Sequence, residues 1–424
     1  MGDEIWKTMP LGDFVTLQRG HDLPDERRRT GHVPILGSFG VTGWHDESRS
    51  LGPGVTVGRS GASFGTVNYT TADYWPLNTA LYVIDFHGNL ERFAYYLLRQ
   101  FDFRSYNSGS AQPSLNRNYI HPILVQVPPL PEQRAIAHIL GSLDDKIELN
   151  RRMNETLEAM ARALFKSWFV DFDPVRAKAE GRDPGLPEQI ADLFPDRLVD
   201  SELGEIPEGW EVRTMENALA ELEVGSRPKG GVFGYTEGVP SIGAESIVGL
   251  GLFDYSKTKY VPREFFERMS RGHVKSGDIL LYKDGGRPGE FEPHLTIVGD
   301  GFPFETCVIN EHVYRLRSIA SLGQSFLFFW LSSDAVMEEM RIKGTGVAIP
   351  GLNSTQVKSL TTLFPTSDAI HAFSTIVDRW VAQVLASCNE SRTLAALRDT
   401  LLPKLISGEL RLKGADKYVE RIAL

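Results

Sequence analysis

The sequence has few cysteines, no long hydrophobic run and no excess of basic residues, and each absence excludes a class of protein. Cys307 and Cys388 are too few for a disulfide framework and cannot by themselves form a zinc site. The longest apolar run, Phe326 to Leu331, is far shorter than the roughly 20 residues that span a bilayer. Residues 1–4 contain neither a basic leader nor a lipidation signal. We therefore expect a cytoplasmic protein without a metal site.

The common catalytic motifs are also absent. The chain has no phosphate-binding G-x-x-x-x-G-K-[ST] loop, no H-E-x-x-H zinc helix and no G-x-S-x-G nucleophile turn. A DNA amino-methyltransferase needs a polar-Pro-Pro-aromatic turn to hold a flipped base, whereas the Pro-Pro pair here, Pro128-Pro129, has apolar neighbours. The missing motifs therefore disfavour a self-contained enzyme.

The composition is that of a folded protein of several domains. Of 424 residues, 42% are hydrophobic and 24% are charged, and a chain of this length normally forms two domains or more. The 45 basic residues against 55 acidic ones give a net charge of −10, which argues against a uniformly basic surface. A nucleic-acid site would therefore have to be a local basic groove.

The chain contains an ordered internal repeat. Val33 to Gly37 is echoed by Val239 to Gly243, and Pro113 to Asn116 by Pro350 to Asn353. The separation between matched positions increases along the chain and then stays constant, as two copies of one module would show if the second carried loop insertions. Runs such as Leu81 to Ile84 have the composition of strands and alternate with shorter helical patterns, so we expect two mixed α/β modules.

A long helical pattern with a heptad-like apolar stripe follows each module, and each stripe is interrupted midway by a polar residue. We interpret the two stripes as the seam of an antiparallel coiled coil, since a rod of about 37 residues is near 55 Å long and exceeds the width of a module. The alternative is that each stripe packs on its own module. The seam residues are Ile136, Leu143, Asn150, Leu157 and Leu164 in the first helix, and Phe373, Trp380, Ser387, Leu394 and Leu401 in the second.

Each module also has a glycine-rich turn with a basic residue after a predicted strand. Arg59 and Ser60 stand in the first turn, and Lys283 and Arg287 in the second. Such turns are either phosphate or guanine contacts or ordinary hairpins. Further candidates are basic residues, and residues at the loop that ends each module, whose amides can pair with adenine. The alternative for the basic residues is a solvated face, and the alternative for the loop residues is a structural turn. These further candidates are Arg19, Arg27, Arg28, Arg29, Gln112, Asn116, Lys343 and Asn353.

Four segments together resemble the specificity subunit of Type I restriction–modification systems, and the resemblance covers essentially the whole chain. They are PLPEQRAI at 129–136, WFVDFDP at 168–174, LGEIPEGW at 203–210 and LPKLISGEL at 402–410. The resemblance implies two target recognition domains separated by two long antiparallel helices in a pseudo-twofold arrangement. The implied order is recognition domain 1 at 1–130, helix 1 at 131–173, a connector at 174–204, recognition domain 2 at 205–365, and helix 2 with a tail at 366–424.

The resemblance also implies a function and partners. The subunit would bind a bipartite target in double-stranded DNA and position two modification subunits, which hold S-adenosylmethionine and methylate adenine N6. Restriction subunits that use ATP and Mg²⁺ can join the complex, and the chain itself would carry no cofactor. The rival hypotheses are a self-contained methyltransferase or nuclease, and a scaffold that does not bind DNA.

Overall fold

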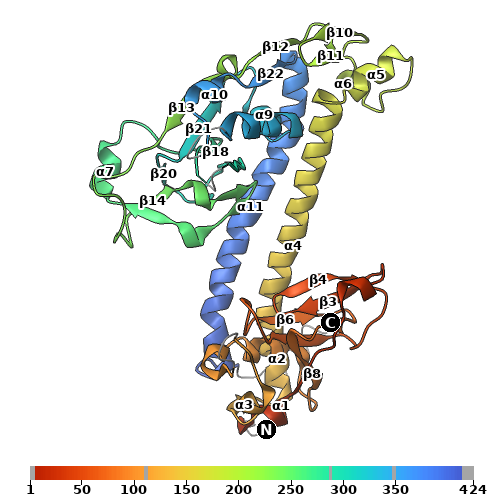
Figure 1. The fold of residues 1–424 in the computed structure, drawn as a ribbon, viewed down its shortest axis with the longest axis vertical. Helices are drawn as coiled ribbons and strands as arrows, with labels where there is room; N and C mark the ends of the chain where they lie inside the picture. The colour runs from red at the N-terminus through yellow and green to blue at the C-terminus, as the bar shows by residue number, and fades with distance from the viewer. Residues whose placement is uncertain (1–4, 109–112, 286–288, 346–349, 413–424) are drawn as a thin grey trace. The chain divides into compact units, whose positions relative to one another are not determined.

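A computed structural model describes residues 5–108, 113–285, 289–345 and 350–412 (Figure 1). The chain divides into two compact units. Unit 1 consists of Met1–Lys146 and Leu394–Leu424, and unit 2 of Ile147–Thr393. Each unit therefore combines a segment of one long helix with a segment of the other, in addition to its own sheets.

Unit 1 contains three sheets. The largest has four antiparallel strands in the order β2-β8-β5-β6, the second has the order β4-β3-β7 with β3 and β7 parallel, and the third pairs β1 with β9. The strands are β1 Lys7–Pro10, β2 Thr16–Arg19, β3 Val33–Gly37, β4 Gly40–His45, β5 Gly54–Gly58, β6 Val67–Thr70, β7 Trp75–Pro76, β8 Ala80–Asp85 and β9 Leu124–Val127. The helices are α1 Leu11–Phe14, α2 Glu91–Leu98 and α3 Arg117–Ile120, with short 3₁₀ turns at Asp25–Arg27 and Phe103–Tyr106.

Unit 2 has the corresponding three sheets with the same strand order and the same directions. They are β13-β21-β18-β19, then β17-β14-β20 with β14 and β20 parallel, and the pair β12-β22. The strands are β12 Glu211–Thr214, β13 Leu219–Val224, β14 Val239–Ile242, β15 Ile247–Gly249, β16 Leu252–Phe253, β17 Lys259–Val261, β18 Ile279–Tyr282, β19 Leu295–Ile297, β20 Val308–Ile309, β21 Val313–Ser318 and β22 Thr361–Phe364. The helices are α7 Arg263–Arg268, α8 Gln324–Leu331, α9 Asp334–Gly344 and α10 Ser354–Lys358, with 3₁₀ turns at Met215–Asn217, Ala244–Ser246 and Tyr255–Lys257.

The predicted mixed α/β class is confirmed, and so are the strand-like runs. Leu81 to Ile84 lies in β8, and the corresponding runs of the second module lie in β18 and β21. These strands are buried on both faces over most of their length, and their β-branched and aliphatic side chains suit a pleated sheet. The two helical patterns between the strands form α2 in unit 1 and the pair α8 and α9 in unit 2.

The connector has more regular secondary structure than the single short helix that its Gly and Pro content suggests. It contains α5 Asp173–Ala179, α6 Glu188–Ala191 and a hairpin of β10 Leu198–Ser201 with β11 Gly204–Pro207. The first long helix, expected at 131–173, also ends earlier than expected. That helix ends at Phe169, Phe172 turns the chain with a φ of 56°, and Pro174 lies in the first turn of α5. A proline is tolerated there because the first helical N–H groups have no intrahelical acceptor.

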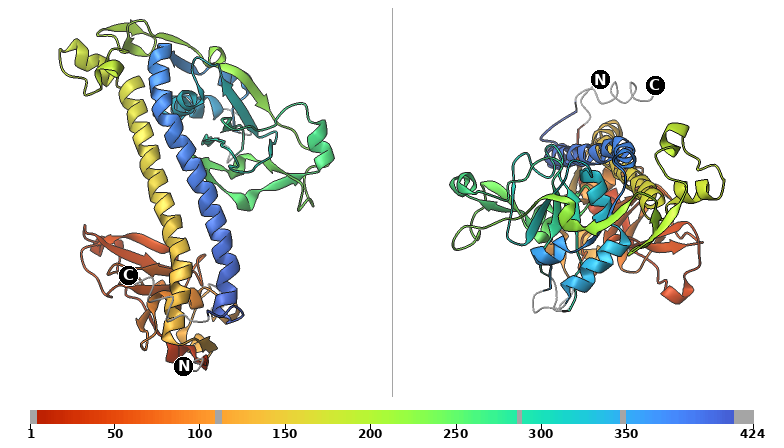
Figure 2. Two further views of the ribbon diagram at one scale, coloured as in Figure 1. Left: turned by 180° about the vertical axis from the view of Figure 1, so that it is seen from behind. Right: turned by 90° about the horizontal axis from the view of Figure 1, so that it is seen from above.

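The two long helices, α4 Leu130–Phe169 and α11 Ser367–Ile406, pack together and run antiparallel (Figures 1 and 2). In unit 1, Arg398 Nη1 lies 2.7 Å from Asp144 Oδ1. In unit 2, Asn150 Nδ2 donates to Glu390 Oε2 at 2.8 Å, and Asn154 Nδ2 lies 3.3 Å from Cys388 Sγ. Helix α4 continues without a break through Gly141. A glycine fits there because the Arg92 guanidinium occupies the space that a Cβ would need, and Arg92 Nη2 donates to the Gly141 carbonyl at 3.0 Å.

The seam residues differ in burial: two lie in the hydrophobic cores of the units, two are buried polar residues, and the others are partly buried. Ile136 belongs to the hydrophobic core of unit 1 and Phe373 to that of unit 2, so each stripe also packs on a module. Asn150 and Ser387 are both buried, and Asn150 Nδ2 lies 3.4 Å from the Ser387 carbonyl oxygen. The remaining seam residues are partly buried, namely Leu143, Leu157, Leu164, Trp380, Leu394 and Leu401.

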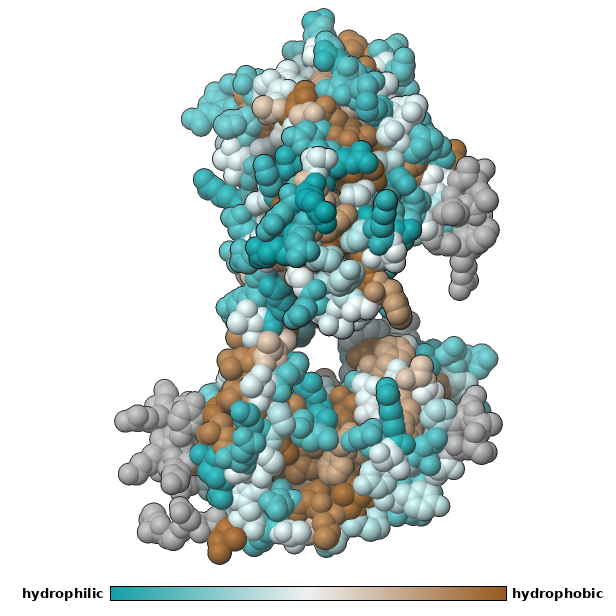
Figure 3. Space-filling model, turned by 90° about the vertical axis from the view of Figure 1, so that its left-hand side faces the viewer, coloured by the Kyte–Doolittle hydropathy of each residue, from teal (hydrophilic) through white to brown (hydrophobic). Residues whose placement is uncertain are grey.

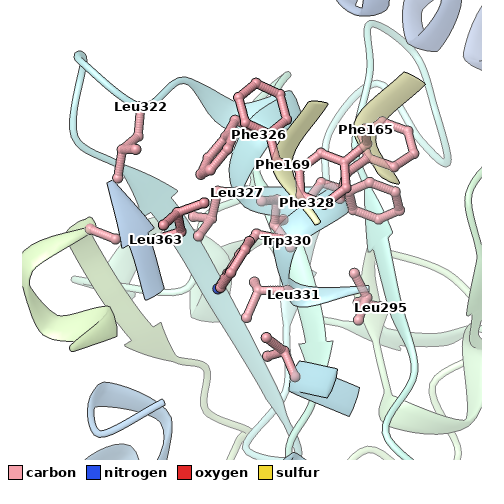
Figure 4. Close-up of a cluster of buried hydrophobic side chains, with 14 of the residues drawn as sticks. Phe165, Phe169, Leu295, Leu322, Phe326, Leu327, Phe328, Trp330, Leu331 and Leu363 are labelled. Atoms are coloured by element: carbon pink, nitrogen blue, oxygen red, sulfur yellow. The ribbon is translucent and has the colours of Figure 1, made fainter. Parts of the chain in front are cut away.

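An aromatic cluster forms the core of unit 2 (Figure 4). Phe165 and Phe169 of α4 pack against Phe326 of α8, with ring centroids 5.7 Å and 5.1 Å away, and Phe373 of α11 lies 5.2 Å from Phe169. Helix α8 is buried along nearly its whole length, which explains why its sequence is apolar on every face. Both long helices are therefore part of the core of this unit.

Unit 1 is closed by contacts of Glu132, in the first turn of α4. Its buried carboxylate accepts from Trp6 Nε1 at 2.8 Å, from Arg411 Nε at 2.9 Å and from the Leu412 N–H at 3.3 Å. Burial acts to raise the pKa of Glu132, but the hydrogen bonds from Arg411 and Trp6 outweigh it and hold the pKa below its usual value. The carboxylate thus joins both ends of the described chain to the start of α4.

Within the described residues, no helix is long and apolar enough to cross a membrane. On the face drawn in Figure 3, hydrophobic residues form separate patches among polar ones.

Replacing Asn150 by Asp should destabilise unit 2, because the new carboxylate would be buried and would face Glu390 where Asn150 now donates a hydrogen bond. We expect a loss of about 2–3 kcal/mol at neutral pH, as for a buried charge without a partner. Burial and the neighbouring charge would raise the pKa of the new carboxyl above its unfolded value, so stability should return as the pH falls toward about 4. Thermal unfolding followed by tryptophan fluorescence at about pH 7.5 and about pH 5 measures this effect.

The control adds Glu390→Gln to Asn150→Asp, which restores a donor opposite the carboxylate and should recover most of the lost stability. An unfolding midpoint for Asn150→Asp that equals the wild type at neutral pH would contradict the packing described for Asn150.

Candidate nucleic-acid interface

The largest sheet of each unit places one basic residue just beyond the end of its third strand in sheet order. Arg59 follows β5 in unit 1, and Lys283 follows β18 in unit 2. The Arg59 N–H donates to the Thr79 carbonyl at 2.8 Å, and the Lys283 N–H donates to the His312 carbonyl at 3.0 Å. In each unit a strand starts directly after the acceptor residue, β8 in unit 1 and β21 in unit 2. The two basic residues therefore hold equivalent backbone positions.

A later segment of each unit binds the carbonyl group of the same basic residue. The Leu115 N–H donates to the Arg59 carbonyl at 2.8 Å, and the Leu352 N–H donates to the Lys283 carbonyl at 2.8 Å. The next residue in each turn forms an antiparallel bridge, Ser60 with Ser114 and Asp284 with Gly351. We call residues 59–60, 78–79 and 114–116 the strand-end site of unit 1, and residues 283–284, 310–312 and 351–353 the strand-end site of unit 2.

The two asparagines at the strand-end sites act as helix N-caps. Asn116 Oδ1 accepts from the Asn118 N–H at 3.0 Å at the start of α3. Asn353 Oδ1 accepts from the Gln356 N–H at 2.9 Å, and Gln356 Oε1 accepts from the Asn353 N–H at 2.8 Å, which completes a capping box at α10. The side-chain oxygen of each asparagine is thus used by the fold, as the structural interpretation of these residues requires.

The basic side chains of the two sites have different partners. Arg59 Nη1 donates to the Asn78 carbonyl at 3.2 Å. Lys283 Nζ pairs with the carboxylate of Asp284 and lies 5.9 Å from the centre of the Tyr314 ring. Both residues are partly exposed, so each can also meet a ligand from solvent.

Asp284 accepts from two cationic or donor groups, Lys283 Nζ and His312 Nδ1. Burial acts to raise the pKa of Asp284, but these two hydrogen bonds outweigh it and keep the pKa below its usual value, so the side chain is ionised at neutral pH. Neither Asp284 nor His312 is among the site residues predicted from the sequence. The repeat contains a signal for both, since Asp284 lies in the glycine-rich turn and His312 follows the repeated Asn310.

A small cleft of about 80 Å³ adjoins the strand-end site of unit 2. Arg227 Nε pairs with Glu311 Oε1 at 2.7 Å, and Lys259 Nζ pairs with Glu245 Oε1 at 2.5 Å. The cleft is lined by Arg227, Val232, Ser241, Lys259, Asn310, Glu311 and His312. Six of these seven residues are polar or charged, so the cleft has both donors and acceptors among its lining residues.

Three of the other predicted basic residues form ion pairs with acidic partners at the surface. Arg19 lies 3.5 Å from Asp22, and Arg28 lies 2.9 Å from Asp25. Arg29 bonds to Asp46 at 2.7 Å and to Glu47 at 2.6 Å. Because exposed pairs contribute about 0–1 kcal/mol, a phosphate could replace their acidic partners at small cost.

The remaining candidates are Lys343, which adjoins the strand-end site of unit 2 because its carbonyl accepts from Gln356 Nε2 at 2.7 Å, then Arg27, and two residues outside the described part of the chain. Lys343 Nζ donates to Ser359 Oγ at 2.8 Å and lies 3.2 Å from Glu339, so it links α9 to the residue after α10. Arg27 is an exposed residue of a 3₁₀ turn. Gln112 and Arg287 lie outside the described residues. Among the described residues, no cluster of His, Cys, Asp and Glu could hold a metal ion.

Comparison with known proteins points to one family. Residues 3–159 match the family model of the Type I restriction modification DNA specificity domain. The chain is 25% identical to the Type I restriction enzyme MjaIX specificity subunit of Methanocaldococcus jannaschii over 348 residues, covering 78% of this chain and 72% of the relative. It is 26% identical to the HindI specificity subunit of Haemophilus influenzae over 404 residues, covering 80% of this chain and 82% of the relative.

A solved structure has the same fold. The crystal structure of the S subunit of a Type I restriction–modification system from M. genitalium superposes with a TM-score of 0.61, at 14% identity, over 96% of this chain and 97% of that chain.

Replacing Gly351 by Ala should open the strand-end site of unit 2. A Cβ at this position would lie 2.5 Å from Asp284 Cβ and 2.6 Å from the Lys283 carbonyl oxygen, so the segment must move away from Lys283. We expect the Leu352 amide, which donates to Lys283, to exchange its hydrogen at least about tenfold faster, which corresponds to a loss of about 1.4 kcal/mol in local stability. Hydrogen–deuterium exchange measures this rate.

The matched control is Ser114→Ala at the equivalent position of unit 1, where a Cβ is already present and the Leu115 amide should keep its exchange rate. Unchanged exchange at Leu352 in Gly351→Ala would contradict the close backbone contact.

Proposed function

We propose that the chain is a specificity subunit of a Type I restriction–modification system and that it recognises a DNA target in two parts, one read by each unit. The match of residues 3–159 to the family model and the similarity to two specificity subunits support this proposal. In this role the chain would be the non-catalytic component of a multisubunit complex. The observation that carries the proposal is the equivalent placement of Arg59 and Lys283 in two sheets of the same strand order.

The duplicated architecture supports two independent half-sites. A basic residue held by its backbone on both sides keeps its side chain in a fixed region, and such a residue can neutralise a phosphate or read guanine. We assign recognition domain 1 to residues 1–130 and recognition domain 2 to residues 205–365. The long helices at 131–173 and 366–424, with the connector at 174–204, then lie between and beyond the two domains in the sequence.

The long helices suit a spacer between the half-sites. Forty residues of α-helix extend about 60 Å at 1.5 Å per residue, which is more than one turn of B-DNA. Antiparallel pairing of two such helices would relate the two recognition domains by a pseudo-twofold axis. Identical partners could then bind equivalent faces on opposite DNA strands.

The partners follow from this arrangement. Two modification subunits that hold S-adenosylmethionine would methylate adenine N6 in each half-site, and restriction subunits that use ATP and Mg²⁺ would join them. The complex would act on cytoplasmic DNA. A self-contained methyltransferase is the second candidate, and it would have to bind S-adenosylmethionine by itself.

The decisive experiment exchanges one module. We expect that replacing residues 205–365 by the corresponding module of a relative changes the bases on one side of the spacer and leaves the other side unchanged, because each unit has its own sheets and core. Sequencing of methylated adenines after co-expression with the modification subunit reads both half-sites at once.

The purified chain without partners is the control, and it should neither methylate DNA nor bind S-adenosylmethionine. A change of both half-sites after the exchange would argue against independent recognition, and methylation by the isolated chain would favour the second candidate.

Charge reversal at the strand-end sites tests the interface itself. In the assembled complex, Arg59→Glu and Lys283→Glu should each weaken DNA binding and lower the slope of log affinity against log salt by about one if the lost contact is to a phosphate. If the contact is to a base, the change should cost about 1–3 kcal/mol and relax one position of one half-site. Fluorescence anisotropy over a range of salt concentrations separates the two.

Arg182→Glu is the matched control, since Arg182 is an exposed arginine of the connector that pairs with Glu180. An effect of Arg182→Glu as large as that of Lys283→Glu would show that general charge, rather than the strand-end site, determines affinity.

A further inference from the structure

The two strand-end sites have the same backbone but differ in one side chain. Ser60 and Asp284 follow the equivalent basic residues, and each forms an antiparallel bridge to the segment that closes the site. A serine hydroxyl both donates and accepts, whereas an ionised carboxylate only accepts. Two units that place different hydrogen-bonding groups at one position would recognise different ligand groups there.

Asp284 is held in one orientation with accepting capacity left over. Lys283 Nζ approaches Oδ2 and His312 Nδ1 approaches Oδ1, so each oxygen receives one described donor. A carboxylate has about four lone-pair positions, and roughly two are therefore available. The side chain is 21% exposed, so a ligand can reach it.

Two glycines adjoin Asp284. Gly285 follows it in the chain, and Gly351 faces it across the bridge, where a Cβ would lie only 2.5 Å from Asp284 Cβ. A Cβ at Gly285 would lie 2.4 Å from the Tyr282 hydroxyl, so both glycines allow tight packing within the turn, and a ligand would reach Asp284 through the exposed part of its carboxylate. Lys283 beside it reduces the repulsion that a carboxylate would otherwise exert on DNA phosphates.

From this geometry we propose that Asp284 is a base-reading residue of unit 2, whose carboxylate accepts a hydrogen bond from the exocyclic amino group of a cytosine or adenine in the major groove. The proposal rests on the proposed function and adds the residue and the chemical group that it reads. N4 of cytosine and N6 of adenine are the amino groups that the major groove displays, and an acidic side chain is a suitable acceptor for them. Ser60, at the equivalent position in unit 1, can bond to either a donor or an acceptor of a base, because a hydroxyl both donates and accepts.

The test uses Asp284→Asn and Asp284→Ser in the complete complex with its modification subunits. Both variants remove the acceptor-only group, and Asn keeps its shape, so the Asn variant carries the test if the Ser variant fails to assemble. The probe is a DNA library randomised over both half-sites, and the readout is sequencing of methylated adenines. We expect preference at one position of one half-site to fall by about 5- to 150-fold, with the other half-site unchanged.

The matched control is Asp254→Asn. Asp254 lies in the same unit, and its carboxylate accepts from the Ser256 N–H as the cap of a 3₁₀ turn, a role that Asn fills equally well. This variant should methylate the wild-type sequence with wild-type selectivity.

Three outcomes would overturn the proposal. An unchanged preference would show that Asp284 does not contact a base. A uniform loss of methylation without a change in preference would show that Asp284 only positions Lys283. A change in both half-sites would show that it acts through the whole complex. Failure of the proposed function is distinguishable, because the wild-type complex would then show no bipartite methylated sequence.

Discussion

The main hydrophobic core of each unit is completed by residues from both long helices, and the rest of the structure depends on this constraint. In unit 1 the core includes Ile136 and Leu140 of α4 together with Leu402 and Leu405 of α11. In unit 2 it includes Phe165 of α4 and Phe373 of α11, among other residues. Burial of such side chains contributes about 1.5–3 kcal/mol each, so neither unit can exclude water from its core until both helices are present and paired. Unit 1 is therefore completed only after α11 has been synthesised.

The two units solve the same closing problem with different chemistry. In unit 1 the buried carboxylate of Glu132 gathers Trp6 and Arg411 through hydrogen bonds. Trp210 directly precedes β12, as Trp6 directly precedes β1. In unit 2, Trp210 packs instead on Phe169 and Phe172, with ring centroids 5.7 Å and 5.8 Å away. A carboxylate with several donors has a fixed geometry, whereas an aromatic cluster is stabilised by area and tolerates more variation. The backbone of the repeat is thus retained while its side-chain contacts have diverged.

Local patterns predict the elements, but not the contacts between distant segments. The runs that form β5, β8, β18 and β21 and the two long helices can be recognised because their side-chain periodicity reflects burial on one or both faces. Strand order and the Glu132 contacts cannot, since they join residues that are far apart in the sequence. Asn353 is a different case. An asparagine followed three residues later by Gln356 has the pattern of a capping box. The two roles expected for Asn353 from the sequence, an adenine-reading amide and a structural turn, do not specify this cap. The repeat is the most informative pattern, because it relates the turn of Arg59 to that of Lys283 from the amino-acid sequence alone.

A backbone held by main-chain hydrogen bonds allows a side chain to change, and with it the recognised group, without a large loss of stability. The hydrogen bonds that hold the strand-end sites, from Leu115 to Arg59 and from Leu352 to Lys283, involve main-chain atoms alone and do not depend on which side chain follows. Ser60 and Asp284 can therefore differ without altering the sheet, because neither side chain belongs to the hydrophobic core of its unit. Asn116 and Asn353 are constrained in the opposite way, since their side chains cap helices that end the same segments. Variation is accordingly least costly at the residue between the fixed basic position and the fixed cap, and this residue is where the two units differ in hydrogen-bonding character.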